Sequence, residues 1–273
     1  MRRRGWIVFG LPALLLFAAF WMVPMIQLAL IGAEPVQGRS AYLAVLVEPL
    51  YWRSLRNTVL LSLAATLATL LLALPAARFL ARHRRFRGRR TLMALLAFPL
   101  AFPGVVVGFL VILLAGRQGL LTSLQTWLGA EPQAYAYGMA GLFVGYLYFS
   151  LPRCIGVLTA ASEQIDASQL EAARTLGASA WRRYADIELP ALRPALMGAG
   201  AMSFATSMGA FGTAFTLATQ INVLPLTIYN EFTNYANLPI AAALSVLLGL
   251  ATWAVLYAAH GLAADPAAAA GRR

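Results

Sequence analysis

Residues 57–77 read NTVLLSLAATLATLLLALPAA, a run of 21 residues that contains no Asp, Glu, Lys or Arg. A helix needs about 20 consecutive, mainly apolar residues to cross the hydrocarbon core of a bilayer. The run has this length and composition, so it predicts a transmembrane helix over residues 57–77.

Five further uncharged stretches flank this run, at residues 5–33, 91–116, 132–152, 194–230 and 232–264. The last two exceed the length of one span and must include loop. We therefore expect an all-α integral membrane protein with six transmembrane helices, at about 6–31, 57–77, 92–115, 134–152, 195–217 and 239–262. The uncharged stretch 118–130 is too short to cross, which leaves a re-entrant and an interfacial helix as alternatives.

The composition supports the membrane class. Of the 273 residues, 60% are hydrophobic and 11% are charged, and the mean hydropathy is +0.71. A soluble domain carries about 25% charged residues. The net charge of +11 comes from 21 arginines, because the chain contains no lysine. These arginines lie in short runs between apolar stretches, which is typical of topology signals and argues against nucleic-acid binding.

The arginines are distributed unequally between the two sides of the membrane. With the N-terminus inside the cell, 17 of the 21 arginines fall in cytoplasmic segments, and Arg39, Arg53, Arg56 and Arg117 fall outside. Cytoplasmic loops carry an excess of Lys and Arg, so both termini are predicted to be cytoplasmic. The first apolar stretch is longer than a signal-peptide core, so an uncleaved helix is preferred to a signal peptide.

Small residues recur at four-residue spacing in the third and fourth predicted helices. The pairs Gly104/Gly108 and Gly141/Gly145 predict close helix–helix packing. Pro99 and Pro103 also fall in the third helix, where kinks are tolerated.

Two absences bear on the energy source. The predicted helices contain no Asp, Glu, Lys or Arg in their interiors, whereas proton-coupled transporters usually need an intramembrane acid or a histidine relay. His260 is the single candidate for such a relay. A P-loop needs a lysine at the nucleotide phosphates, and this chain has none.

With one cysteine, Cys154, and two histidines, no zinc-ligand spacing exists, and we identify no catalytic and no metal-binding residues.

The longest predicted cytoplasmic loop, residues 153–193, carries five of the ten acidic residues of the chain. Ser168-x-x-Glu171 is a capping-box pattern, which predicts a helix that begins there. Gly177 is placed to end this helix, because glycine readily adopts positive φ.

A second helix is predicted directly after the first. Ser179 is placed to cap it, and it would run to about Glu188, where Leu189-Pro190 would stop it. We therefore expect a helix–turn–helix elbow on the cytoplasmic face, between the fourth and fifth transmembrane helices.

The residues Glu171-Ala172-Ala173, Gly177 and Ile187-x-Leu189-Pro190, spaced by three and nine residues, resemble the EAA loop of binding-protein-dependent ABC importer permeases. The residue types and the spacing match throughout. One departure is Ala167, where related permeases often have proline. The resemblance implies a single transmembrane permease domain over residues 1–264, which includes the EAA loop at 163–190, and a short cytoplasmic tail at 265–273. It also implies a multi-pass protein of the bacterial inner membrane.

In that family the loop forms the coupling helix, which docks into a groove of a cytosolic ATPase. The resemblance therefore implies that seven residues couple this chain to an ATPase: Glu171, Ala172, Ala173, Gly177, Ile187, Leu189 and Pro190. It implies no cofactor in this chain, because ATP and magnesium would be bound by a partner subunit. The implied partners are an ATPase dimer, a second permease subunit that is identical or related, an extracytoplasmic solute-binding protein and membrane lipid.

Polar residues of the fifth helix and the loop after it are candidates for the translocation path: Ser203, Thr206, Ser207, Thr213, Thr216, Thr219, Gln220 and Asn222. They are uncharged, so selection would rest on shape and hydrogen bonds. Helix–helix hydrogen bonding is their alternative role. Residues 221–231 are similar to permeases for polyamines, sulfate, iron(III) and phosphonate, and a polyamine such as putrescine or spermidine is the leading expectation.

The leading interpretation is thus the permease subunit of an ABC importer, which is not itself an enzyme. A self-sufficient secondary transporter or channel is one alternative, and a membrane scaffold without a transport role is another. The intact loop pattern favours the first interpretation, and the lack of charge inside the predicted helices opposes the second.

Overall fold

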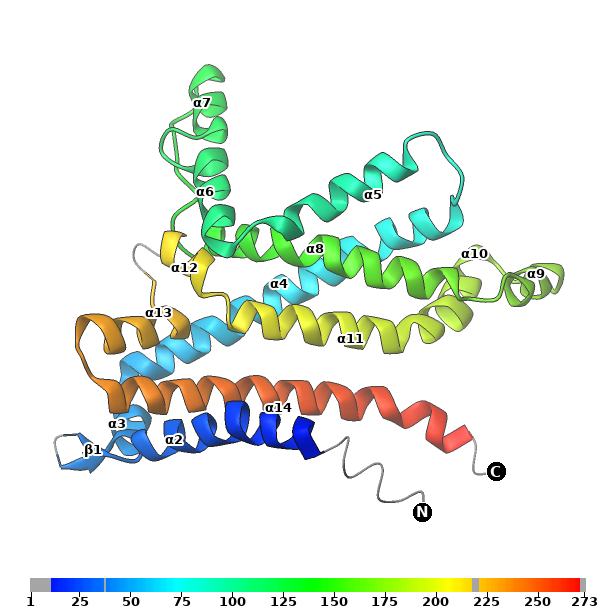
Figure 1. Cartoon of the computed structure of the whole chain (residues 1–273). Coiled ribbons are helices and arrows are strands. Elements are labelled where there is room, and N and C mark those ends of the chain that lie inside the picture. The colour runs from blue at the N-terminus through cyan, green and yellow to red at the C-terminus, as the bar shows by residue number, and fades with distance from the viewer. Residues whose placement is uncertain (1–10, 37, 218–220, 271–273) are drawn as a thin grey trace, which may run out of the picture. The chain divides into compact units, whose positions relative to one another are not determined.

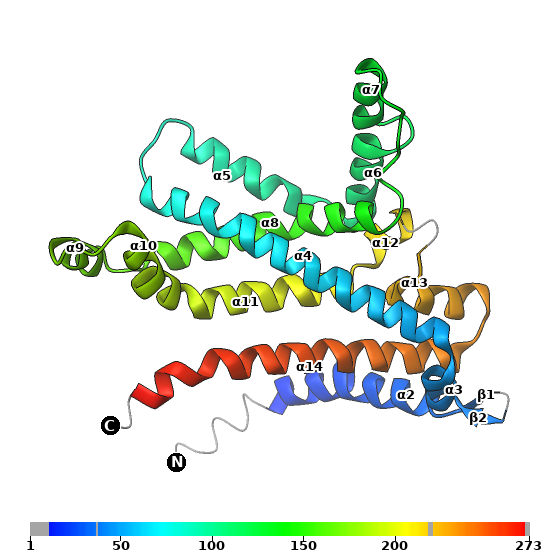
Figure 2. The ribbon, with the colours of Figure 1, turned by 180° about the vertical axis from the view of Figure 1, so that it is seen from behind.

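A computed structural model describes residues 11–36, 38–217 and 221–270 (Figures 1 and 2). Residues 6–10 of the first predicted helix and 271–273 of the tail lie outside this description, as does the side chain of His260. The described elements, in chain order, are η1 (Ala18–Met22), α2 (Val23–Ile31), β1 (Pro35–Val36), β2 (Arg39–Ser40), α3 (Ala41–Val47), α4 (Pro49–Arg82), α5 (Arg89–Ala97), η2 (Phe98–Ala101), α6 (Gly104–Ala115), α7 (Leu120–Trp127), α8 (Met139–Glu163), α9 (Ala167–Thr175), α10 (Ala180–Arg183), η3 (Tyr184–Glu188), α11 (Leu189–Met208), α12 (Phe211–Leu217), α13 (Leu224–Tyr229), η4 (Asn230–Asn234) and α14 (Leu238–Ala270).

The chain divides into two compact units. One unit comprises Met1–Arg56 with Leu224–Leu250, and the other comprises Asn57–Val223 with Ala251–Arg273. In the first unit, β1 and β2 form a two-stranded antiparallel hairpin. The hydroxyl of Tyr51 donates a 3.0 Å hydrogen bond to Glu231 Oε1 in the same unit.

Within the described residues, five helical segments are long and apolar enough to cross a membrane: Leu11–Ile31, Pro49–Arg82, Gly104–Trp127, Met139–Glu163 and Leu238–Ala259. The expectation of six such helices is thus met in part. The predicted helix 57–77 is longer than expected, because α4 has 34 residues and continues through Pro75. At 1.5 Å per residue α4 measures about 50 Å, which exceeds the hydrocarbon core.

The prediction of one continuous helix over residues 92–115 is wrong. The chain forms α5, the 3₁₀ turn η2 and α6 instead, and Phe102 has an extended backbone with ψ 133°. Two prolines explain this break. Pro99 and Pro103 lack the N–H that a helix interior requires, and Pro103 also disfavours helical geometry at Phe102. Residues 120–127 form the separate short helix α7.

The predicted helix 134–152 is shifted toward the C-terminus. It is observed as α8, which begins at Met139 and continues through Pro152 and Arg153 to Glu163. α8 therefore includes Arg153, a charged residue that lies just beyond the predicted helix 134–152.

The predicted helix 195–217 is observed as two helices, α11 and α12, which are separated at Gly209 and Ala210. Arg193, two prolines and several hydroxyl residues lower the hydropathy of α11, which explains why it is not among these five segments. The last predicted helix, 239–262, is contained in α14.

Figures 1 and 2 show α8 and α11 side by side in the second unit. Between them, Cys154 is buried and lies 3.7 Å from the carbonyl oxygen of Ala199. The short helix α12 lies against α6 and α8. Gly104 and Gly108 of α6 and Gly145 of α8 face Thr213 or Thr216 of α12, so close that side chains at these glycines would crowd the threonines. The expected close helix–helix packing is thus found at Gly104, Gly108 and Gly145.

Gly108→Ala should destabilise the second unit, because its new Cβ would overlap the side chain of Thr216. Overpacking of this kind costs about 1–3 kcal/mol. Thermal unfolding of the detergent-solubilised protein measures the effect. Gly156→Ala is the matched control, because nothing lies within 4 Å of its added Cβ. If Gly108→Ala and Gly156→Ala unfold at the same temperature, the close approach of α6 and α12 is incorrect.

Candidate functional site

The segment between α8 and α11 begins with a helix whose N-cap is Asp166. The side chain of Asp166 accepts a 2.9 Å hydrogen bond from the backbone N–H of Ser168. Hydrogen bonding to Ser168 lowers the pKa of the Asp166 carboxyl. The capping box predicted at Ser168 and Glu171 is therefore wrong, because Asp166 caps the helix two residues earlier and places Glu171 in its second turn.

Gly177 ends α9, as the sequence predicts. Its φ is +78°, in the left-handed region that glycine adopts most readily. The N–H of Gly177 bonds to the carbonyl of Arg174 at 3.0 Å, and the N–H of Ala178 bonds to that of Ala173 at 2.9 Å. This pair of bonds is a Schellman motif, which satisfies the last carbonyls of the helix.

The second helix of the segment begins where predicted but does not end at Pro190. The hydroxyl of Ser179 accepts a hydrogen bond from the N–H of Arg182. From there α10, the π-helical η3 and α11 follow one another without a break. The expected stop at Leu189-Pro190 is thus wrong, because proline is tolerated in the first turn of α11.

Several side chains of the segment are exposed on its outer surface. Glu171 and Ala172 are exposed, and Leu176 is 87% exposed. Within the described part of the chain, Glu171 makes no hydrogen bond or ion pair. A large apolar side chain this accessible, in the same short segment as an unengaged carboxylate, is typical of a surface that contacts another protein.

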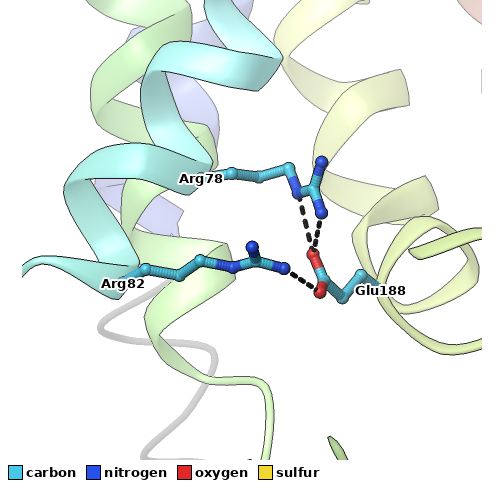
Figure 3. Close-up of polar contacts among 3 residues, drawn as sticks. All are labelled: Arg78, Arg82 and Glu188. Carbon is cyan, nitrogen blue, oxygen red and sulfur yellow. Dashed lines mark hydrogen bonds and ion pairs between the residues drawn. The ribbon is translucent and has the colours of Figure 1, made fainter. Parts of the chain in front are cut away.

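The inner end of the segment is held by Glu188, which is 5% exposed (Figure 3). Its carboxylate forms ion pairs with two arginines of α4, at 2.7 Å with Arg78 and a second with Arg82. The Arg78 guanidinium also lies 4.0 Å from the centre of the Tyr184 ring. Charge-assisted bonds of this kind are about twice as strong as neutral ones, so Glu188 ties η3 to α4.

A second ion pair stands beside the first. Arg89 lies 2.8 Å from the carboxylate of Glu163, at the end of α8, and Arg84 donates to the carbonyl of that residue at 2.8 Å. A cavity of about 330 Å³ is lined by Arg84 and by Glu188 with its two arginine partners. Ala167 and Leu170 of α9 line it, so this cavity lies directly beneath the segment.

A different cavity, of about 360 Å³, lies where α8, α11 and α12 meet the start of α6. Two predicted path residues, Thr206 and Thr213, line it together with Arg153. Arg153 donates a 3.2 Å hydrogen bond to the hydroxyl of Thr206, and Thr213 donates one of 3.1 Å to the carbonyl of Gly104.

The other predicted path residues do not line this cavity. Ser203 and Ser207 are buried in α11, and Thr216 donates to the carbonyls of Gly212 and Thr213. Asn222 is exposed, and its carbonyl accepts a bond from Asn57. Thr219 and Gln220 lie outside the described residues.

The sequence does not single out Arg153 as a site residue, because the predicted helix ends at residue 152 and Arg153 falls in the predicted cytoplasmic loop. A signal was available: residues 154–162 carry no charge, so the apolar stretch continues for nine residues beyond Arg153. An apolar stretch that is allowed to include one arginine would extend the predicted helix to residue 162 and would include Arg153.

Known proteins share this sequence and fold. The thiamine transport system permease protein ThiP of Brucella abortus is 33% identical over 182 residues, which cover 66% of this chain and 34% of that protein. This chain therefore spans about a third of that relative's length. The molybdenum transport system permease protein ModB of Haemophilus influenzae is 30% identical, over 64% of this chain and 78% of its own.

A solved structure supports the fold. A bacterial ABC transporter involved in the import of the acidic polysaccharide alginate superposes with a TM-score of 0.77 at 19% identity, over 96% of both chains. Residues 71–264 match the family described as binding-protein-dependent transport system inner membrane component. This match extends over more than half of the sequence, from α4 to α14. The chain therefore belongs to the family of binding-protein-dependent transport system inner membrane components.

Proposed function

We propose that this chain is the permease subunit of an ABC importer, which is driven by an ATPase on a separate polypeptide. The exposed segment from Asp166 to Glu188 is the observation that carries the proposal. Family membership supports it, and so does the absence of lysine, which rules out an ordinary P-loop in this sequence.

The docking residues are proposed to be Glu171, Ala172, Ala173 and Gly177. The short alanine side chains would let a partner approach the backbone closely. Glu171 supplies a charge without a partner in the described chain, and Gly177 adopts the positive φ that the turn requires. Ile187, Leu189 and Pro190 lie in the helix that leads into α11, so we assign them to transmission rather than to docking.

The remaining partners follow from the same role. We propose an ATPase dimer on the cytoplasmic side, a second permease subunit and an extracytoplasmic solute-binding protein. Both termini would be cytoplasmic in this arrangement, and ATP and magnesium would be bound by the ATPase. The two relatives described above are named for thiamine and molybdenum, so they give no support to a polyamine as the solute.

Glu171→Lys should disrupt docking, because it places a positive charge where the proposed partner meets a carboxylate. We expect uptake and ATPase co-purification to fall at least about tenfold, which corresponds to about 1.4 kcal/mol of binding free energy. Pull-down of the detergent-solubilised, tagged chain from its native host measures the retained ATPase, and membrane content measures insertion.

Glu131→Lys is the matched control, because it makes the same charge change at an exposed residue outside the segment. The control should retain the ATPase. Full retention of the ATPase by Glu171→Lys, or solute uptake into vesicles by this chain without an ATPase, would contradict the proposed function.

A further inference from the structure

Arg153 places a charge in the wall of the cavity of about 360 Å³. Arg153 lies in α8, the segment Met139–Glu163, which is apolar and long enough to span the membrane. It precedes Glu163 by about 15 Å along the helix axis at 1.5 Å per residue. Ionisable residues within transmembrane segments are costly, and they usually face a water-filled cavity or mark a solute pathway.

The positive charge of Arg153 is not neutralised within the described chain. The ion pairs found there involve Arg78, Arg82 and Arg89, and none involves Arg153. Among the described residues that line the cavity, Arg153 alone is ionisable. Arg153 donates instead to the neutral hydroxyl of Thr206, at 3.2 Å.

The neighbouring groups suit an anion that carries oxygen atoms. The Thr206 hydroxyl is available to reorient from the carbonyl of Met202, to which it donates at 2.7 Å. A guanidinium presents several N–H donors in a plane, which matches carboxylate, phosphate and similar groups. The first turn of α6, at Gly104, adds the positive end of a helix to the same wall.

The aromatic side chains limit the solute. Phe102, Phe149 and Phe211 line the cavity and offer no acceptor to a cation other than their ring faces. No carboxylate from the described residues lines the cavity to balance a cation. A positively charged solute would be repelled by Arg153 and would find no carboxylate among these described lining residues to offset that repulsion.

From these observations we infer that the cavity at Arg153 is a transient binding site for a small oxyanion on its way through the membrane. Arg153 compensates the charge of the solute, and Thr206 adds a hydrogen bond. The inference rests on the proposed transport function, which supplies the reason for a solute to enter.

Site-resolved chemical labelling tests the site without requiring transport. The full chain, in lipid nanodiscs with the subunits that co-purify with it, is treated with phenylglyoxal, and labelling of Arg153 is measured by mass spectrometry. The probes are sodium sulfate, sodium phosphate and sodium molybdate. Choline chloride and glucose are the controls, and sodium chloride brings every solution to the same ionic strength. Exposed Arg117 is the internal reference.

We expect at least one oxyanion to slow the labelling of Arg153 about threefold or more, without slowing that of Arg117. Protection by choline or glucose alone, or by none of the probes, would overturn the inference. Nanodiscs of phosphatidylcholine and of phosphatidylglycerol separate a dissolved anion from a lipid head group. Protection that depends on phosphatidylglycerol and not on the dissolved anions would assign the cavity to lipid and would also overturn it.

Substitutions connect the site to transport. Arg153→Gln should abolish or reduce at least tenfold the uptake of the protecting anion, and Arg153→Lys should retain a larger part of it because the charge is kept. Equal uptake by Arg153→Gln and the wild type would count against the inference. If no ATPase co-purifies while the anion still protects Arg153, the proposed function fails and the binding site stands.

Discussion

Replacing Glu188 by glutamine should cause one of the largest losses of function of any single substitution in this chain. The change removes the negative charge that pairs with both Arg78 and Arg82, and leaves a buried amide in its place. Breaking a buried ion pair costs about 3–5 kcal/mol, and the 57% exposure of the Arg82 side chain reduces this to about 2–3 kcal/mol. Thermal unfolding and solute uptake together measure the effect.

The consequence for transport follows from the position of Glu188. Because this carboxylate joins η3 to α4, we expect that without it a movement of the segment would no longer be transmitted to α4. We expect uptake to fall more than about tenfold while ATPase co-purification with Glu188→Gln persists, since the docking surface is unchanged.

Glu163→Gln is the matched control, because Glu163 pairs with one arginine, Arg89, and its side chain is 34% exposed. An exposed pair of this kind contributes about 0–1 kcal/mol. Equal effects of Glu163→Gln and Glu188→Gln on stability and uptake would show that Glu188 has no special role.

Gly177→Val should uncouple transport almost completely. The φ of +78° is strongly unfavourable for a β-branched residue, which pushes the turn toward another conformation. The expected cost to the native turn is about 1–2 kcal/mol, and the Schellman motif is lost with it. Nothing lies within 4 Å of a Cβ added at Gly177, so the effect comes from the backbone and not from crowding. Uptake, ATPase co-purification and membrane content measure the result.

Gly177→Asn separates backbone strain from the loss of glycine itself. Asparagine tolerates the left-handed region, so this variant should retain much of the uptake that Gly177→Val loses. A Gly177→Val protein that transports at the wild-type rate would refute the requirement for this turn. A Gly177→Asn protein as inactive as Gly177→Val would show that the backbone is not the cause.

Much of the fold could be predicted because apolar run length is a direct physical signal. Four of the expected spans correspond to long apolar helical segments, and a fifth, 92–115, overlaps one only at residues 104–115. The stop at Gly177 follows from its conformational freedom. The helix boundaries could not be predicted in the same way. α4 continues past its apolar run because the backbone hydrogen bonds of a helix persist beyond the hydrocarbon core, where charged side chains meet water. α8 continues past residue 152 because the uncharged sequence resumes after Arg153.

The breaks within predicted helices have local causes that apolarity does not report. Pro99 and Pro103 interrupt the third predicted helix, whereas Pro75 and Pro152 are accommodated inside α4 and α8. The sequence offers no simple rule to separate these cases, because tolerance of proline depends on whether neighbouring groups satisfy the freed carbonyl. The same dependence on context hid Arg153, whose place in a cavity is set by three helices that are distant in sequence.

The run from Ala180 to Met208 is helical without a break and measures about 43 Å, at 1.5 Å per residue. It begins at the proposed docking turn, and Thr206 lies near its other end. A tilt of about 10° about the cytoplasmic end would therefore carry the far end through about 7 Å, by the same helical dimensions. If an ATPase moves the cytoplasmic end, as the proposed function requires, a small tilt of this helix would change the shape of the cavity lined by Arg153 and Thr206.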